Sequence, residues 1–356
     1  MIVLFTSNKE GGVVQFTTQL AKELIKKRRE VVCYFPEGTE NTDDSLGKIS
    51  VVYYKKNNRL FSFDESIRSL AAEIEKIKPE FVWFVDEAII CSQVARNLKS
   101  VRFIFTIHDP CPHPSLNESL RKKLHDWFSL YERKISQKKA RCIVLLSQNS
   151  FESFKKDNKG NYTIVVLPLG AHIPAVKSNP LPEINITEKF FLFFGRIDKY
   201  KGLGTILKAY DSCKIPDVKL VVAGKGILSA EEKEMIQKNK SIVLINRYIN
   251  DGEMLWLFSN ALATCLPYIE ATQSGVIPIS YSFGVPVITS DVKGLTEFVY
   301  NGLTGYICKT VEEYSKALNI LFYNPDGIDF RKNCVYYYGD NLAWDKNLNI
   351  VLEAIE

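Results

Sequence analysis

The stretch FFLFFGRIDKYKGLGTILKAY (190–210) contains the structural unit from which this chain is built. Its first five residues are all apolar, without polar alternation, which is typical of a strand buried on both faces of a parallel sheet. Gly195 permits a turn, and the apolar spacing from 203 to 212 fits a helix. The stretch therefore predicts a strand, a polar loop and a helix, as in doubly wound α/β domains.

The same pattern continues on both sides of this stretch. After it, we expect strands at 218–223, 242–245, 261–266, 285–289 and 305–308, and helices at 229–239, 251–260, 274–283 and 311–322. Before it, we expect strands at 2–6, 31–35, 49–54, 81–85, 101–107, 142–146 and 163–167, and helices at 13–28, 64–78, 118–138 and 148–157.

Residues 168–189 separate the two halves, with four prolines and little periodicity, which is a linker composition. We therefore predict two Rossmann-like doubly wound domains that face each other across a cleft. Their expected bounds are 1–170 and 190–330, with a linker at 171–189 and a helical segment at 331–356 that either caps the second domain or crosses back to the first.

Composition narrows the functional classes. The 356 residues are 46% hydrophobic and 24% charged, as in ordinary globular proteins, and the net charge of +5 is too small to predict nucleic-acid binding by itself. The eight cysteines form no Cys-x-x-Cys pair, so we expect neither disulfides nor a zinc site. Without a signal peptide or a run of about 20 apolar residues, we expect a cytoplasmic protein that is at most peripheral to a membrane.

Arg196 and Lys201 are the strongest local indication of a ligand. They follow the end of a predicted strand and precede a helix N-terminus, which favours anions. Arg offers a planar fork for phosphate, and Lys adds a mobile charge. The alternative is a solvated basic loop.

Two further positions follow strands of the first domain. Gly11 and Gly12 let backbone approach a ligand closely, although no complete dinucleotide fingerprint is present and a tight turn without ligand is the alternative. His108 ends the strand at 101–107 and could orient a hydroxyl or move a proton, or else bond to backbone. Its spacing to Cys111 and His113 matches no standard metal site, so we expect no metal.

Three segments remain open between two interpretations. Thr272 and Ser274 would cap a helix and form an anion seat, with Glu270 beside it either stabilising a cationic sugar ring or exposed as a surface acid. Residues 247–249 would hold a base edge, although capping of the next helix by Asn250 or Asp251 is favoured. The basic helix end at 22–29 would contact anionic lipid or simply complement the helix dipole.

Together these features resemble the retaining nucleotide-sugar glycosyltransferases of family 4, which have the GT-B fold. The resemblance is most specific in the second domain and looser in the first. It rests on FFGRIDKYKG (193–202), VVAGKG (221–226), NRYINDGEM (246–254), the run from LPY to GYIC (266–308), EGGVVQF (10–16) and IHDPCPHP (107–114).

The resemblance implies roles for residues of this chain. Arg196 and Lys201 would grip the donor diphosphate, and His108 would contact the transferred sugar, with Glu270 as the remaining catalytic candidate. Donor contacts would also come from Gly11, Gly12, Arg247, Tyr248, Ile249, Thr272, Ser274, Gly275 and Val276, and Glu297 would be structural.

The chain departs from the family pattern at one acid. The family has a second glutamate that grips the ribose five positions before a Gly-x-Pro-Val, and that position here is Ile279. Glu270 is also one residue farther from this position than the pattern requires. Ribose recognition is therefore unexplained by the resemblance.

The resemblance implies transfer of a sugar from a nucleotide diphosphate sugar to a glycan or lipid-linked acceptor. We expect retention of configuration, no metal and no resident cofactor. Capsule, O-antigen or exopolysaccharide assembly is the expected setting, with contact at the anionic inner face of a membrane. The alternatives are a non-catalytic sugar-nucleotide-binding partner, or an epimerase or phosphorylase of the same fold.

Overall fold

The structure is a computed structural model that describes residues 1–39, 49–56, 65–108, 110, 120–158, 160, 162–185 and 188–355, with only the backbone for 120–126. It divides into two compact units. Unit 1 comprises Met1–Pro168 and Trp344–Glu356, and unit 2 comprises Leu169–Ala343. Each unit is built on its own sheet, and each is described separately below.

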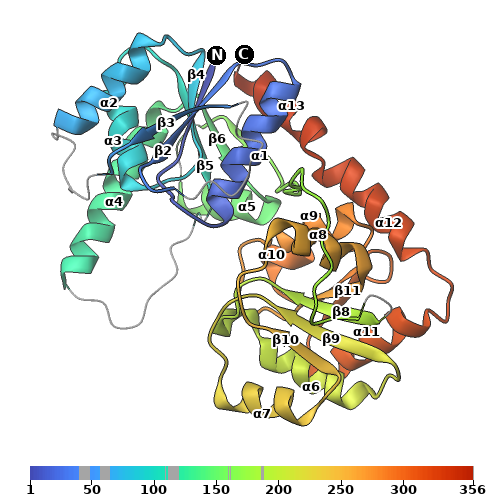
Figure 1. Ribbon diagram of the computed structural model, residues 1–356. Helices are drawn as coiled ribbons and strands as arrows, with labels where there is room; N and C mark the ends of the chain where they lie inside the picture. The colour runs from blue at the N-terminus through green and yellow to red at the C-terminus, as the bar shows by residue number, and fades with distance from the viewer. Residues whose placement is uncertain are drawn as a thin grey trace. The chain divides into compact units, whose positions relative to one another are not determined.

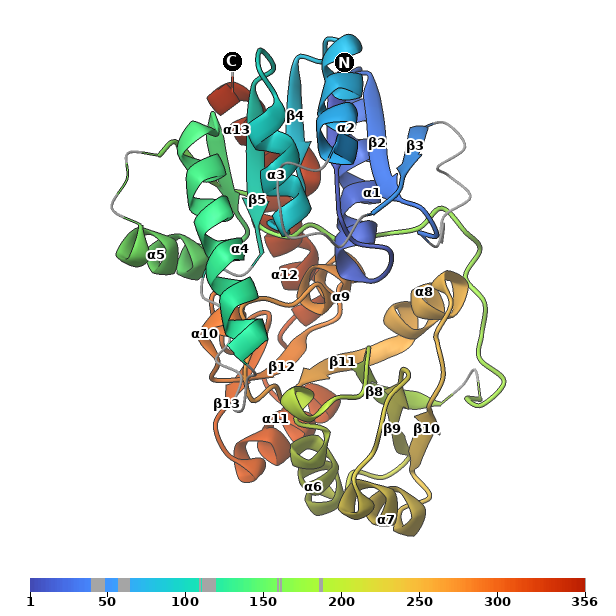
Figure 2. The ribbon, with the colours of Figure 1, turned by 90° about the vertical axis from the view of Figure 1, so that its left-hand side faces the viewer.

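The sheet of unit 1 is parallel throughout and has the order β3-β2-β1-β4-β5-β6-β7 within the described residues. The chain winds outward from β1 in one direction and then restarts at β4 in the other, which is the doubly wound topology expected from the sequence (Figure 2). Its strands are β1 (Ile2–Phe5), β2 (Val31–Pro36), β3 (Ser50–Tyr54), β4 (Phe81–Phe84), β5 (Phe103–Ile107), β6 (Cys142–Leu145) and β7 (Ile164–Val166).

Helices cover both faces of this sheet. On one face α2, α3 and α5 bury their apolar residues against the strands, with α4 beside α3. On the other face α1 and α13 lie side by side (Figure 1). The helices are α1 (Gly12–Lys26), α2 (Glu65–Lys76), α3 (Ile89–Asn97), α4 (Leu120–Lys139), α5 (Gln148–Asp157) and α13 (Trp344–Ile355).

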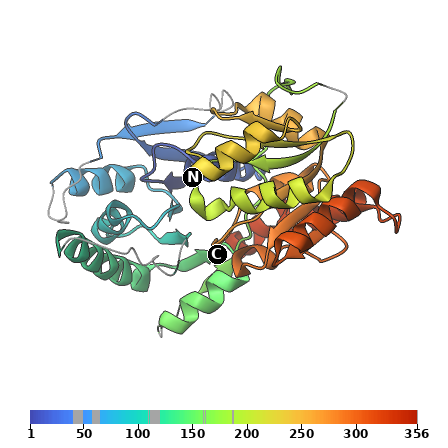
Figure 3. The same cartoon turned by 90° about the horizontal axis from the view of Figure 1, so that it is seen from below.

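Unit 2 repeats the topology with the order β10-β9-β8-β11-β12-β13, again all parallel. Helices α6, α7 and α11 pack on one face, with α6 between the other two, and α8 packs on the other (Figure 3). The strands are β8 (Lys189–Phe194), β9 (Val218–Ala223), β10 (Ile242–Ile245), β11 (Ala261–Leu266), β12 (Val287–Ser290) and β13 (Gly305–Cys308).

The helices of unit 2 include several short ones around the end of β11. The regular ones are α6 (Leu203–Cys213), α7 (Ala230–Lys238), α8 (Asp251–Asn260), α9 (Val276–Ser282), α11 (Val311–Tyr323) and α12 (Phe330–Tyr337). A 3-10 turn η2 (Lys199–Lys201), a one-turn helix α10 (Lys293–Thr296) and a π-helical turn η3 (Tyr338–Leu342) complete the unit. The sequence did not predict α3, which has no side-chain cap, or α10, which is too short to show a period.

The segment expected as a linker, 171–189, lies within unit 2 in the structure. Its apolar residues Leu181 and Ile184 are buried in the core formed with α8. The segment is therefore anchored to the second core by a few buried residues, and unit 2 begins at Leu169.

The helix α13 completes unit 1 although 175 residues of unit 2 precede it. The Trp344 ring packs on Phe16 of α1, with ring centroids 5.2 Å apart. Lys27 Nζ donates to the carbonyl oxygen of Asp345 at 2.8 Å, and Arg102 donates to that of Ile355 at 3.3 Å. Leu348 and Val351 are fully buried, so α13 supplies core that unit 1 otherwise lacks.

We therefore expect Leu348→Ala to lower the free energy of unfolding by about 2–5 kcal/mol, because it leaves a cavity beneath α13. Ile350→Ala on the same helix is the matched control. Its side chain is 48% exposed, so its cost is expected to stay within about 0.5 kcal/mol. Urea denaturation followed by circular dichroism measures both, and equal costs would show that α13 does not contribute core.

Candidate functional site

The candidate site of unit 2 lies where its sheet reverses direction, between β8 and β11. At this point the loops that follow two neighbouring strands lead away to opposite faces, which leaves a crevice at the carboxyl edge. Here the two loops are tied together, since the Ile269 N–H donates to the Tyr200 carbonyl at 2.7 Å. Gly202 has φ +64°, and a Cβ built on it would lie 2.0 Å from the carbonyl oxygen of Pro267. Glycine at 202 is therefore required for this contact.

Lys201 is held at the centre of this junction. Asp198 caps η2 by accepting from the Lys199 N–H at 2.7 Å, and Lys201 is the last residue of that turn. Only 7% of Lys201 is exposed. Its Nζ donates to the Phe194 carbonyl at 3.3 Å and lies 5.1 Å from the centre of the Tyr268 ring. Gly195 makes room for it, because a Cβ there would come within 2.7 Å of Nζ.

The charges at this junction are uncompensated. Arg196 is exposed, and within the described part of the chain no carboxylate forms a salt bridge with Arg196 or Lys201. Burial lowers the pKa of Lys201, and Arg196 lowers it further, while Tyr200 and Asp198 act in the opposite direction. Two neighbouring cations, one of them desolvated, form a site that an anion would stabilise.

Tyr268 connects this pair to the segment before α9. Its hydroxyl lies 3.5 Å from Ser274 Oγ, and burial raises the pKa of Tyr268 to about 12, so the phenol stays protonated. Ser274 Oγ also accepts from the Val276 N–H at 3.3 Å. The Tyr268 ring thus lies between Lys201 and Ser274, and Arg196 is an electrostatic neighbour of Lys201.

The helix start differs from the sequence prediction. The residue that caps α9 is Gly275, and neither Thr272 nor Ser274 occupies the cap position. The helix begins at Val276, two residues later than predicted, because Ser274 turns back to bond the N–H two residues ahead. Thr272 is half-buried, and Glu270 is exposed on the bend after β11.

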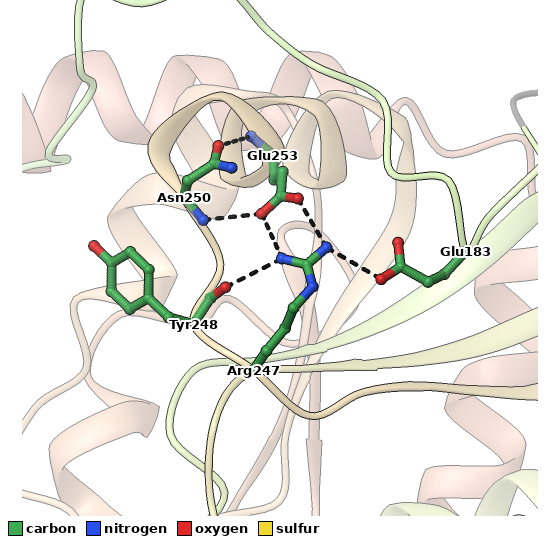
Figure 4. A network of polar contacts seen from close by, with 5 residues as sticks. All are labelled: Glu183, Arg247, Tyr248, Asn250 and Glu253. Atoms are coloured by element: carbon green, nitrogen blue, oxygen red, sulfur yellow. Dashed lines mark hydrogen bonds and ion pairs between the residues drawn. The ribbon is translucent and has the colours of Figure 1, made fainter.

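Arg247 is neutralised by residues of its own unit, as Figure 4 shows. Its guanidinium donates to both oxygens of Glu253 at 2.8 Å and to Glu183 at 3.1 Å. These carboxylates raise its pKa far above the ordinary range, so the charge is permanent but paired. The Arg247 guanidinium is therefore committed to carboxylates of unit 2, and base binding by residues 247–249 stays a prediction.

The capping interpretation of this segment is confirmed. Asn250 caps α8 and accepts from the Glu253 N–H at 3.0 Å, while the Glu253 carboxylate accepts from the Asn250 N–H at 3.0 Å. Ile249 is buried, and Tyr248 is 62% exposed. Arg247 then ties this cap to the segment around Glu183, which explains why the predicted linker is held against unit 2 (Figure 4).

The reversal point of unit 1, between β1 and β4, is organised by the buried carboxylate of Asp86. Its oxygens accept from the Thr6 hydroxyl at 2.7 Å, the Ser7 N–H at 2.7 Å and the Ala88 N–H at 3.0 Å. The Ser7 hydroxyl, the Asn8 amide and the Cys91 thiol also donate to it. Burial alone would raise the pKa of Asp86, but these hydrogen bonds together outweigh burial and hold it below its ordinary value.

Gly11 and Gly12 come shortly after Thr6, Ser7 and Asn8 of this network in the sequence. Gly11 is the residue before α1, with φ +81°, and no side chain caps the helix. A Cβ built on either glycine would meet no atom within 4 Å, so packing does not require the two glycines. The backbone N–H groups of this helix start lie open beside Asn8 at the carboxyl edge of the sheet.

His108 directly follows β5, and its ring is fixed on one side. Nε2 lies 2.9 Å from the Val85 carbonyl oxygen, which can only accept, so Nε2 carries the proton. The ring meets Phe16 edge-on, with centroids 5.6 Å apart, and the His108 N–H donates to Glu87 at 3.1 Å. The backbone-bonded interpretation of His108 is correct for Nε2, and in the neutral ring Nδ1 is an acceptor.

Most cations of the basic helix end at 22–29 have partners in unit 1. Lys26 pairs with Glu23 at 2.7 Å, Lys27 donates to the Asp345 carbonyl, and Arg29 lies 3.4 Å from Glu80. This surface is therefore largely compensated by the chain itself.

Other predicted positions lie outside the described residues, namely Asp109, Cys111 and His113. Among the residues that are described, no group of three His, Cys, Asp or Glu side chains could hold a metal ion. In that same part of the chain, no helix is both long and apolar enough to cross a bilayer. Ile279, at the position of the family's second acid, packs against the core near α8.

Comparison with known proteins places this geometry in a family. Residues 180–340 match the model for glycosyl transferases group 1, and residues 10–172 match that for glycosyltransferase family 4. The chain belongs to the family 4-like glycosyltransferases. It is 27% identical over 165 residues to O-antigen chain mannosyltransferase C of Escherichia coli, an alignment that covers 44% of each chain.

Two further similarities extend this assignment. The family member is 30% identical over 175 residues to the α-1,3/1,6-mannosyltransferase ALG2 of Dictyostelium discoideum, covering 42% of this chain and 41% of that one. The alignments thus span less than half the length of these two relatives. Anabaena HepE, solved in complex with UDP-glucose, has a TM-score of 0.75 at 14% identity over 99% of both chains, which confirms the GT-B fold.

Tyr268 and Asp86 were not predicted as site residues, although the position of each in the sequence carried a signal. Both follow a buried strand at the point where the sheet reverses, which is where ligand-binding and organising residues collect. The strand order that identifies those two strands was not available from the sequence alone. In this glycosyltransferase family member, the reversal point could be located only after the sheets were known.

We predict that Asp86→Ala lowers the free energy of unfolding of unit 1 by about 3–5 kcal/mol, because six donors lose their acceptor in the interior. The wild type gains this stability above the ordinary Asp pKa of about 4 and loses it as the pH falls through the lowered pKa. The Asp86→Ala variant should therefore show a weaker loss of stability between about pH 5 and pH 2 in urea titrations. An unchanged acid dependence would contradict an ionised Asp86.

Lys201→Met gives a second prediction. Because burial disfavours the ammonium, the methionine variant should keep or exceed the wild-type melting temperature without ligand. It should bind pyrophosphate or a nucleoside diphosphate at least about tenfold more weakly, as measured by thermal shift. In the wild type, affinity should fall as the pH rises through the lowered pKa of Lys201, since binding needs the protonated amine.

Lys199→Met is the matched control for this experiment. Lys199 lies in the same turn but is exposed. The control should bind the same anions within about twofold of the wild type. Equal losses in the two variants would show that general positive charge, and not the buried amine, binds the anion.

Proposed function

We propose that this protein transfers a sugar from a nucleotide diphosphate sugar to a glycan or lipid-linked acceptor. The observation that carries the proposal is the uncompensated pair Arg196 and Lys201 at the reversal point of the second sheet. A diphosphate supplies the negative charge that this pair lacks. Family membership and the UDP-glucose bound by HepE support a sugar nucleotide over a free anion.

The reaction breaks the bond between the anomeric carbon and the diphosphate oxygen, and that oxygen keeps the electron pair. The oxygen of an acceptor hydroxyl forms the new bond to the anomeric carbon, and its proton passes to the departing diphosphate oxygen. Arg196 and Lys201 stabilise the departing diphosphate, and each such preorganised donor contributes about 3–4 kcal/mol. With these cations on the diphosphate, the proposed reaction needs neither a metal ion nor a resident cofactor.

Tyr268 keeps Lys201 in place for this task. The aromatic ring attracts the ammonium without neutralising it, so the full charge stays available to the leaving group. The Ser274 hydroxyl and the Gly275 N–H are further candidate donors for the diphosphate, whereas the Val276 N–H already donates to Ser274 Oγ. Glu270, exposed after β11, is the carboxylate that we assign to the positive charge developing on the sugar ring.

Unit 1 offers candidate groups of its own for the substrates. The open N–H groups at Gly11 and Gly12 suit an anionic or hydroxyl oxygen. His108 can accept a hydrogen bond from a sugar hydroxyl through Nδ1, because Nε2 is already committed to Val85.

We propose retention of configuration at the anomeric carbon. We also propose a hexosyl donor, and mannose is tested first, since two relatives are named as mannosyltransferases. Cell-surface glycan assembly is the proposed setting, as for the O-antigen relative.

The test begins with a thermal-shift screen of GDP-mannose, UDP-glucose and other sugar nucleotides, followed by transfer assays with the best binder. Arg196→Ala should lower kcat by at least about 100-fold with the melting temperature unchanged, because the lost cation acts on developing charge. Arg68→Ala, an exposed arginine on α2, is the control and should retain activity. Proton NMR of the product should show the anomer of the donor.

Two results would contradict the proposal. If no sugar nucleotide raises the melting temperature, or if Arg196→Ala transfers sugar at the wild-type rate, the cation pair is not the donor site. Incubation with the donor alone separates the alternatives. An epimerised or phosphorolysed product would indicate an epimerase or a phosphorylase of the same fold. Tight binding of the donor without turnover would indicate a non-catalytic binding partner.

A further inference from the structure

The helix α4 carries an exposed apolar and basic surface, the α4 stripe, formed by Trp127, Leu130, Tyr131, Lys134 and Lys138. Their spacing of three and four residues places them on one side of a helix. Trp127 is 65% exposed and Tyr131 is 51% exposed, and their rings stack with centroids 5.9 Å apart. Large aromatic side chains left in water next to one another indicate a surface that meets a partner.

The opposite side of α4 fixes the direction of the stripe. Glu132 is buried and accepts from Arg96 of α3 at 2.6 and 2.7 Å, and Ser136 is fully buried one turn later. Arg133 lies 3.8 Å from Glu87, which itself bonds the His108 backbone. These contacts hold α4 against α3 (Figures 1 and 2), so the helix cannot rotate to cover the aromatic pair.

The helix α4 has a large excess of basic residues. Its sequence LRKKLHDWFSLYERKISQKK contains seven Lys or Arg and two Asp or Glu, an excess as large as the +5 of the whole chain. Of the two acids, Glu132 is already paired with Arg96. Among the described residues, Lys134 and Lys138 have no salt bridge, unlike Lys26 and Arg29 at the end of α1.

We propose that the α4 stripe binds the surface of an anionic lipid bilayer. Tryptophan and tyrosine side chains favour the headgroup level of a bilayer, because their rings are apolar but carry a polar N–H or O–H group that contacts water there. Lysines that continue the same side of the helix would meet lipid phosphates. Contact lies in the plane of the interface, because no described helix could span a membrane. The inference rests on the proposed function in that a lipid-linked acceptor would bring the substrate to this surface.

Sedimentation with vesicles tests the proposal without donor or acceptor. Vesicles of phosphatidylglycerol and phosphatidylcholine in equal parts should bind the full-length protein at low salt, and pure phosphatidylcholine vesicles should bind it far less. Trp127→Ser/Tyr131→Ser and Lys134→Glu/Lys138→Glu should each lower partitioning at least about tenfold. All four substituted side chains are exposed, so the melting temperatures should not change.

Matched controls lie on unit 2. Tyr323→Ser/Tyr336→Ser removes two exposed rings of similar exposure, and Lys316→Glu/Lys332→Glu makes the same change in net charge. Both controls should bind within about twofold of the wild type. The proposal is overturned if the wild type does not bind anionic vesicles, or if the controls lose as much as the α4 variants. A loss confined to the lysine variants would indicate general affinity for polyanions and would also overturn it.

Transfer to a soluble acceptor, measured without vesicles, separates this inference from the proposed function. The α4 variants should retain that activity, because no group of the α4 stripe belongs to the donor site. Vesicle binding by a protein without transfer activity would support the membrane surface and contradict the function. Transfer activity without vesicle binding would support the proposed function and contradict the membrane surface.

Discussion

The contact between the loops after β8 and β11 is the constraint on which the candidate site of unit 2 depends. In a doubly wound sheet, the two central strands send their chains to opposite faces, so nothing in the topology itself holds their loops together. Here backbone meets backbone, and Gly202 leaves no space for even one methyl group beside Pro267. This close approach places Lys201 under Tyr268 and leaves Arg196 exposed beside it.

Unit 1 meets the same topological requirement with different chemistry. At its reversal point the ends of β1 and β4 are joined by one buried carboxylate that accepts from both loops. The network is saturated, since Asp86 has donors for both of its oxygens, and it fixes Ser7 and Asn8 in the loop that leads to α1. One unit thus closes its reversal point with a satisfied anion, whereas the other keeps unsatisfied cations there. That difference identifies unit 2 as the unit that binds the diphosphate in our proposal.

Basic residues in this chain differ mainly in whether an acid of the same unit already faces them. Arg247 is surrounded by Glu183 and Glu253, and Arg29 and Lys26 have acids of their own. Among the described residues, no acid forms a salt bridge with Arg196 or Lys201. Because the charged amine of Lys201 is desolvated, it lowers the stability of the protein without a bound anion. Functional sites commonly contain charged groups that bind a ligand although they lower the stability of the fold.

Much of the fold could be predicted from hydrophobic runs, because strands buried on both faces have uninterrupted apolar sequences. The strands at 218–223, 242–245 and 261–266 and the helices at 148–157 and 251–260 have the predicted bounds. Short helices without a clear period, such as α3 and α10, could not be predicted. The start of α9 was misplaced because Thr272 and Ser274 have the residue types of caps, while the structure uses Gly275.

The sequence by itself determined that there are two parallel-sheet units, and it determined the loops that carry Gly11, His108, Arg196 and Lys201, because apolar runs and turn residues act locally. Only the tertiary structure decided which of these groups are available. It paired Arg247 with two carboxylates, committed Nε2 of His108 to Val85, and brought Asp86 and Tyr268 to the reversal points. The physical reason is that compensation of charge and satisfaction of hydrogen bonds depend on which groups the folded chain brings together, and partners such as Glu183 for Arg247 and Asp86 for Thr6 are distant in sequence.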